Sequence, residues 1–150
     1  MRRFTVLLLL LFPLLQARAP GGHAVYVGGT NADLPRKAEG WIQTTDANEM
    51  RFAGKLTTVR VPYENITNIE YGQKVGRRYV EALLISPILL LAKKRSHFLT
   101  VGYTGADGTQ QAMVFQLSQA DVRVVLVGLE ARTGRKVEYQ DDEARKAGKG

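Results

Sequence analysis

Residues able to carry catalysis are few in this 150-residue chain. The sequence has no cysteine, which excludes a disulfide framework, a thiolate metal site and a thiol nucleophile. Its two histidines are His23 and His97, and a histidine base needs a nucleophile and an orienting carboxylate that no spacing here supplies. We therefore expect no catalytic residues, no cofactor and no bound metal, and an enzyme of unrecognised class is the least favoured hypothesis.

Acidic residues gather at two places where a cation could bind. Asp107 precedes Gly108 between two apolar runs, and an Asp-Gly pair in that position is typical of a hairpin turn. Residues 141–143 are Asp-Asp-Glu in a charged tail, without the rigid loop that fixes coordination geometry. A turn and a solvated tail explain both groups better than a metal site.

One apolar stretch, residues 79–92, has the character of a binding element, with basic residues at 77–78 and 93–95 on either side. Fourteen residues that include Glu81 and Pro87 are too short to span a bilayer but could lie in its interface. The flanking cations would then meet anionic head groups. The predicted membrane or partner contacts are Leu84, Ile85, Ile88, Leu89 and Leu90, and the predicted electrostatic anchors are Arg77, Arg78, Lys93, Lys94 and Arg95.

The same stretch has two other interpretations. Its aliphatic side chains could belong to the hydrophobic core, because a small domain needs most of its large apolar residues inside. The chain would then be a structural or assembly subunit that binds no lipid. An exposed apolar patch could equally mark a protein interface. The expected partner is therefore an anionic membrane surface or a protein, and the sequence leaves the oligomeric state open.

The first residues have the features of a secretory signal peptide. Two arginines precede an apolar run over residues 4–15, which is shorter than a membrane-spanning helix. Residues 17–19 (Ala-Arg-Ala) form one cleavage motif and residues 22–24 (Gly-His-Ala) form another, which would cut before Val25. We predict a cleavable signal peptide over residues 1–24 and a secreted or periplasmic protein, with an uncleaved anchor as the alternative.

Removal of this leader changes the charge balance. The chain carries 21 basic and 14 acidic residues, a net charge of +7, and three of the basic residues lie within 1–24, which leaves +4. The basic groups at 93–95 and 132–136 lack the interleaved aromatic side chains on which bases stack. Nucleic acid is therefore not an expected partner.

Alternating and β-branched runs predict six or seven short strands. Turn residues at 46–48 separate the second strand from the third, and Pro62 indicates that the fourth is an edge strand or ends there. The predicted strands are residues 24–27, 41–45, 49–52, 58–63, 66–71, 97–104 and 110–117.

A single helix is expected after the last strand. Ser118 and Asp121 predict its capped start, and Gly134 predicts its end. Between them, apolar residues recur at i, i+3, i+4 and i+7, one stripe of an amphipathic helix: Val122, Val125, Leu126 and Leu129. The chain then divides into the signal peptide 1–24, a lead-in strand and loop 25–39, a domain 40–136 and a charged flexible tail 137–150.

Spaced apolar residues with a Val-Pro turn run through this domain: Gly40-Trp41-Ile42, Thr44, Phe52, Val59-Arg60-Val61-Pro62-Tyr63, Ile66 and Ile69-Glu70. With the helix at 122–129, this pattern resembles the GRAM and bacterial PH-like domains over about residues 40–132. The resemblance implies a mainly β fold, a PH-like antiparallel barrel of six or seven strands capped by a C-terminal helix. It also implies a non-enzymatic lipid- or protein-binding module. The turn at 46–49 is acidic where phosphoinositide-binding members carry Lys-x-Arg, so an inositol lipid is not the expected ligand.

Overall fold

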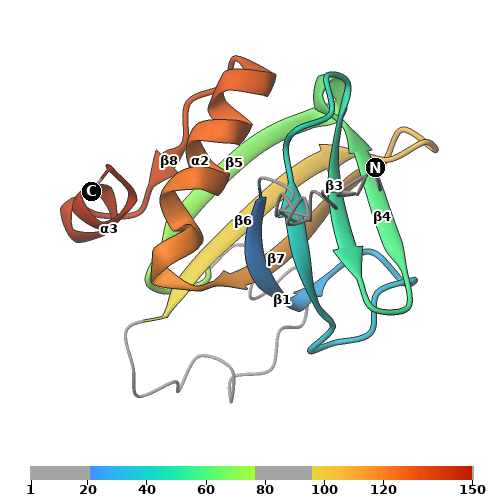
Figure 1. The fold of residues 1–150 in the computed structure, drawn as a ribbon. Helices are drawn as coiled ribbons and strands as arrows, with labels where there is room; N and C mark the ends of the chain where they lie inside the picture. Colours follow the sequence, from blue (N-terminus) through green and yellow to red (C-terminus); the bar gives the residue numbers. More distant parts are fainter. Residues whose placement is uncertain (1–20, 77–95, 150) are drawn as a thin grey trace, which may run out of the picture.

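The computed structural model describes residues 21–76 and 96–149, which form one eight-stranded sheet and two α-helices (Figure 1). The first half contains β1 (Gly21–Gly29), β2 (Glu39–Gln43), β3 (Glu49–Gly54), β4 (Thr58–Pro62), the 3-10 helix η1 (Tyr63–Asn65) and β5 (Ile66–Gly72). The second half contains β6 (His97–Thr104), β7 (Gln110–Leu117), α2 (Gln119–Thr133), β8 (Glu138–Tyr139) and α3 (Asp142–Lys149).

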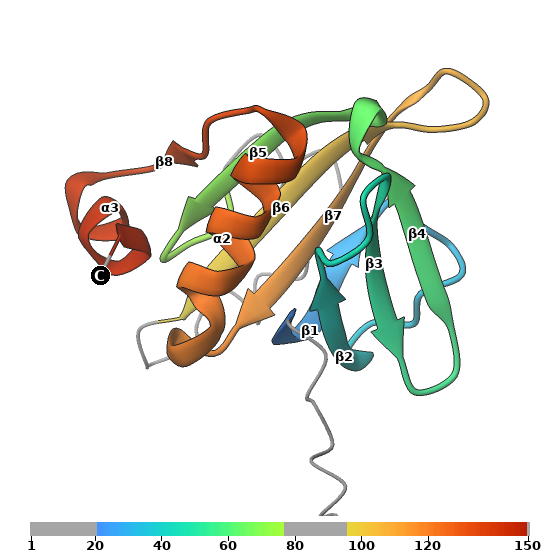
Figure 2. The same cartoon turned by 45° about the horizontal axis from the view of Figure 1, so that its top comes forward.

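The strands follow the order β4-β3-β2-β1-β7-β6-β5-β8, and only the β5–β8 pair is parallel. Strand β1 lies in the middle because it pairs twice: Gly21 to Val25 pair with β2, and Ala24 to Gly29 pair with β7. The sheet bends there into two arms, one of β2–β4 and one of β5–β7 (Figure 2). A β-bulge between Tyr26 and Gly28 allows this strand to serve both arms.

The hydrophobic core lies between the two arms and under α2. Alternate residues of each strand point into it, which follows from the two-residue period of a strand. Fully buried aromatic rings lie at its centre, where the ring of Phe115 contacts the rings of both Tyr26 and Phe52. Helix α2 closes this side with the predicted apolar stripe: Val122, Val125, Leu126 and Leu129 are all at most 1% exposed.

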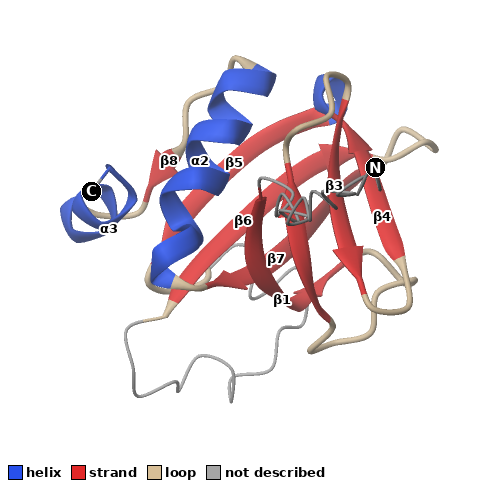
Figure 3. Ribbon diagram, in the orientation of Figure 1, coloured by secondary structure: helices blue, strands red, loops and turns tan. Residues whose placement is uncertain are grey.

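Several sequence predictions are confirmed. The mainly β character, the strands at 97–104 and 110–117, and a C-terminal helix are all present (Figure 3). Strand β4 is the last strand of its arm, as Pro62 indicated. Ser118 is the N-cap of α2 and Gly134 ends it in the left-handed conformation, although the Ser118 hydroxyl donates to the Asp121 carboxylate instead of bonding the backbone.

The prediction of a closed barrel of six or seven strands is wrong. The sheet has eight strands and stays open, because β4 and β8 end its two edges and do not pair with each other. The outer edge of β5 is occupied by β8, where Glu70 and Tyr71 pair with Glu138 and Tyr139. A two-residue strand has no periodicity of its own, so the sequence did not reveal it.

Two predicted boundaries also differ from the structure. The residues from 137 onward, expected to be a flexible tail, form β8 and α3, and Ala144 of α3 is fully buried in the core. The division at 24/25 falls inside β1, whose first four residues pair with β2. Strand β1 is therefore a central strand of the sheet and not a lead-in.

Candidate functional site

The ten residues predicted as contacts and anchors all lie within 77–95, outside the residues that the structure describes. What it describes is the two points at which the chain enters and leaves this stretch. We call the sheet face opposite the core, on β1, β7, β6 and β5, the outer face. Its side chains include Val27, Val114, Thr100, Phe98 and Glu70, which alternate along their strands with residues of the core cluster.

The chain enters the stretch on the outer face. After β5 it folds back, so that Gly76 lies against the Glu70 side chain: a Cβ atom added at Gly76 would stand 2.3 Å from Glu70 Oε1. Only a glycine fits there without displacing the carboxylate. The same carboxylate accepts a hydrogen bond of 2.9 Å from Gln140 Nε2, and Val75 beside it is buried.

The chain also leaves the stretch on the outer face. Ser96 is buried, and its Oγ lies 3.4 Å from Nε2 of Gln116 on β7, which donates to it. Gln116 pairs with Phe98 across β6 and β7, so both residues lie on the outer face. The two ends of the stretch therefore meet the same face of the sheet.

The connection is much longer than the strands require. Strands β5 and β6 are adjacent and antiparallel, with Gly72 opposite Phe98, and two to five residues are enough to join such a pair. This connection has 24 residues between Gly72 and His97. Connections longer than about 12–15 residues are uncommon in compact domains, and most of them are functional loops or linkers.

Charge is concentrated in the same stretch. Of the chain's 21 basic and 14 acidic residues, 13 of each lie in the two described ranges, so those ranges are neutral overall. Outside 1–20, the whole positive excess comes from the five cations that flank residues 79–92, offset by Glu81. Arg77 directly follows Gly76, and Arg95 directly precedes Ser96.

His97 has a structural environment. Its Nδ1 shares a hydrogen bond with the hydroxyl of Tyr71 on the neighbouring strand, and both side chains are buried. Burial lowers the pKa of His97 and raises the pKa of Tyr71 to about 12, so both groups are neutral at physiological pH. This pair satisfies two polar groups inside the protein.

The acidic groups are likewise explained by local structure. Asp107 accepts hydrogen bonds from the N–H and the hydroxyl of Thr109, which lower its pKa and fix the β6–β7 turn, as the sequence predicted. Asp141 accepts the N–H of Ala144 at 2.6 Å and so caps the start of α3. Within residues 21–76 and 96–149, no three ligating side chains gather as a metal site requires.

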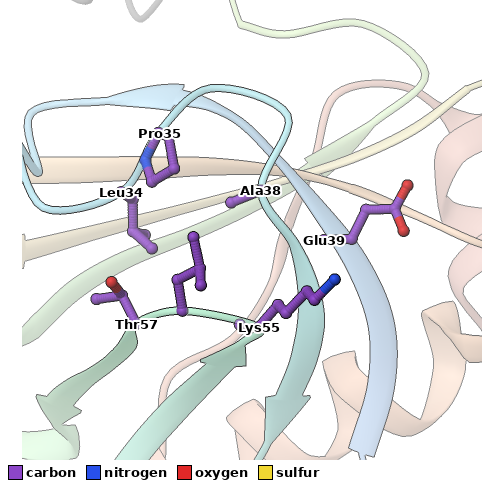
Figure 4. A pocket seen from close by; sticks show the side chains of 8 residues that line it. Leu34, Pro35, Ala38, Glu39, Lys55 and Thr57 are labelled. Carbon is purple, nitrogen blue, oxygen red and sulfur yellow. The ribbon is translucent and has the colours of Figure 1, made fainter.

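A separate apolar hollow lies at the opposite end of the sheet, between the β1–β2 loop and the β3–β4 turn (Figure 4). Leu34, Pro35 and Ala38 line one side, and Lys55, Leu56 and Thr57 line the other. Leu56 is 89% exposed at the tip of its turn. No sequence prediction covered this hollow, although Leu56, a leucine beside Lys55 in a turn between two strands, indicated an exposed apolar residue there.

Compared with known proteins, the chain matches no protein-family model, and no curated protein is similar enough to count as a relative. The resemblance to GRAM and PH-like domains therefore rests on the sequence pattern. Among the described helices, none has the length and apolar character needed to cross a bilayer.

Proposed function

We propose that this chain is an exported, non-enzymatic binding module with a PH-like arrangement of strands, which engages an anionic membrane surface through the basic residues on either side of 79–92. One observation carries the proposal. Gly76 and Ser96 flank the segment that contains both basic groups, at 77–78 and 93–95. Both residues lie on the outer face, so the chain enters and leaves that segment on one side of the molecule.

Electrostatics supports a membrane as the ligand. Each cation near an anionic bilayer contributes about 1 kcal/mol, and the five cations belong to a chain whose described residues are neutral overall. Peripheral binding strength increases with electrostatic attraction to anionic lipids, which a basic cluster provides. Strands β1–β7 precede helix α2 along the chain. The resemblance to PH-like domains implies this sequence of elements, and the domains that the chain resembles are binding modules.

The test is flotation of the purified chain, beginning at Pro20, with vesicles of neutral lipid or of neutral and anionic lipid. We expect flotation with the anionic vesicles alone and its loss at high salt, because salt screens exposed charges. Replacing the five anchors by glutamine should abolish flotation and leave thermal unfolding unchanged.

Two matched variants make the test specific. In the first variant, glutamine replaces five cations on α2, α3 and the segment between them, so the net charge changes by the same amount as in the anchor variant. This variant should still float. Its substituted positions are Arg123, Arg135, Lys136, Arg145 and Lys146. A double variant of Lys55→Gln and Leu56→Ser alters the hollow at the other end of the sheet and should also float. If folded protein does not float, the membrane is not the ligand, and a protein partner takes its place. If only the hollow variant loses flotation, the contact lies at the hollow.

A further inference from the structure

The outer face of the sheet is buried as deeply as the core. One row of side chains crosses three neighbouring strands, and its members are 0%, 2% and 9% exposed: Val114, Thr100 and Glu70. Next to this row, Val27 at the bulge of β1 is 4% exposed. Phe98 in the next row is 4% exposed. A side chain flanked only by its own sheet stays open to water from above, so burial on both faces requires a second layer.

The described helices and strands do not provide that layer. The buried apolar side chains of α2, together with Ala144 of α3, belong to the core cluster on the opposite face. Five apolar residues are buried and lie outside that core cluster: Val27, Val75, Phe98, Ala112 and Val114. They form a second apolar surface, centred on β6 and β7 and limited by the polar groups of Glu70 and Gln116.

We propose that residues 79–92 pack on the outer face as its second layer. Both ends of the connection already lie there, Gly76 against Glu70 and Ser96 against Gln116. The 19 residues between them can cross the four strands and return, because the strands are about 4.8 Å apart and an extended chain advances about 3.3 Å per residue.

The chemistry of the two surfaces is complementary. The outer face presents Phe98, Val114 and Val27, and the segment supplies an almost continuous aliphatic run. Aliphatic side chains gain free energy when they bury such a surface. This assigns an intramolecular role to Leu84, Ile85, Ile88, Leu89 and Leu90, whereas the flanking cations stay free to bind an anionic surface. The inference does not depend on the proposed function.

The absence of cysteine allows a direct test, because a single introduced thiol reports the exposure of one position. Thr100→Cys places a small thiol on the outer face, and Ala24→Cys places one in the core. We expect both thiols to react slowly with a maleimide in the chain beginning at Pro20. With residues 79–92 replaced by a short Gly-Ser linker, the thiol at position 100 should react about tenfold or more faster, and the thiol at position 24 should stay protected.

Three outcomes of the labelling would overturn the proposal. The thiol at position 100 could react at the same rate with and without residues 79–92. Its protection could depend on residues 1–19, which would make the N-terminal segment the layer. Its protection could also rise with protein concentration, which would make a second copy of the chain the layer.

A second measurement keeps the full segment and does not depend on the folding of the shortened chain. The Thr100→Cys substitution is combined with a cysteine at each position from 83 to 90 in turn, and a short bismaleimide is added. Efficient cross-linking at some of these positions within the monomer supports the proposal. No cross-link at any of the eight positions, in protein that keeps its thermal transition, contradicts it.

Discussion

The backbone N–H of His23 donates a hydrogen bond to Oδ2 of Asp121, 3.2 Å away, and so joins the start of β1 to the first turn of α2. Gly22 beside it lies under the helix, where a Cβ atom would stand 2.4 Å from Val125. These contacts, with four register pairs to β2, belong to residues that a cut before Val25 would remove.

We therefore predict that a chain beginning at Val25 is less stable than one beginning at Pro20, by about 2–4 kcal/mol, since each lost hydrogen bond contributes about 1 kcal/mol. Urea unfolding followed by tryptophan fluorescence measures the difference through Trp41 on β2. Equal midpoints would show that residues 20–24 do not contribute to the sheet. For the same reason, the mass of exported protein should correspond to cleavage after residues 17–19, before Pro20.

The buried face of α2 should dominate the stability of the helix. Leu129→Ala removes a fully buried side chain and leaves a cavity, which we expect to cost about 2–4 kcal/mol. Val127→Ala on the exposed face is the control and should change the unfolding free energy by less than about 0.5 kcal/mol. Chemical denaturation compares the two variants. Similar losses for both would mean that the exposed face of α2 is also covered.

Acidification should destabilise the protein through His97. Burial lowers the pKa of this imidazole in the native state, and unfolding returns it to its ordinary value near 6.5. Between those two pKa values the unfolded chain binds the extra proton, so the unfolding free energy falls as the pH falls below about 6.5. His97→Gln should flatten the pH dependence directly below about pH 6.5, measured by urea unfolding at each pH.

The carboxylates provide an internal control for that measurement. Hydrogen bonds lower the pKa of Asp46 and of Asp107 in the native state, so their stabilising effect is present above about pH 4 and is lost only at lower pH. The decrease in stability below pH 4 should therefore persist in the His97 variant. An unchanged profile over the whole range would show that His97 does not titrate differently in the two states.

Gly134 should resist substitution by residues with a side chain. It ends α2 with φ of 69°, and its N–H donates to the carbonyl of Glu130. Gly134→Ala should cost about 1 kcal/mol, because L-residues rarely adopt positive φ. Gly134→Asn should recover part of this loss, since asparagine tolerates the left-handed conformation. Thermal unfolding ranks the three chains, and equal values for alanine and glycine would contradict the prediction.

Elements that have their own period or turn chemistry could be predicted from the sequence. The strands at 97–104 and 110–117 around Asp107-Gly108, and the stripe from Val122 to Leu129, are local patterns that tertiary contacts reinforced. The sequence also located the apolar segment and its cations, whose role as a site stays a prediction because they lie outside the described residues.

How those elements combine depends on tertiary contacts. Whether β5 closes a barrel or pairs with β8 depends on residues about 70 apart in the chain, and Glu138–Tyr139 is too short to have a period. The run Met113-Val114-Phe115 belongs to a strand that was expected to bury one face. Val114 is nevertheless fully buried on the other, outer face. Burial of a second face is a property of whatever packs there, so it appears only when distant segments are brought together.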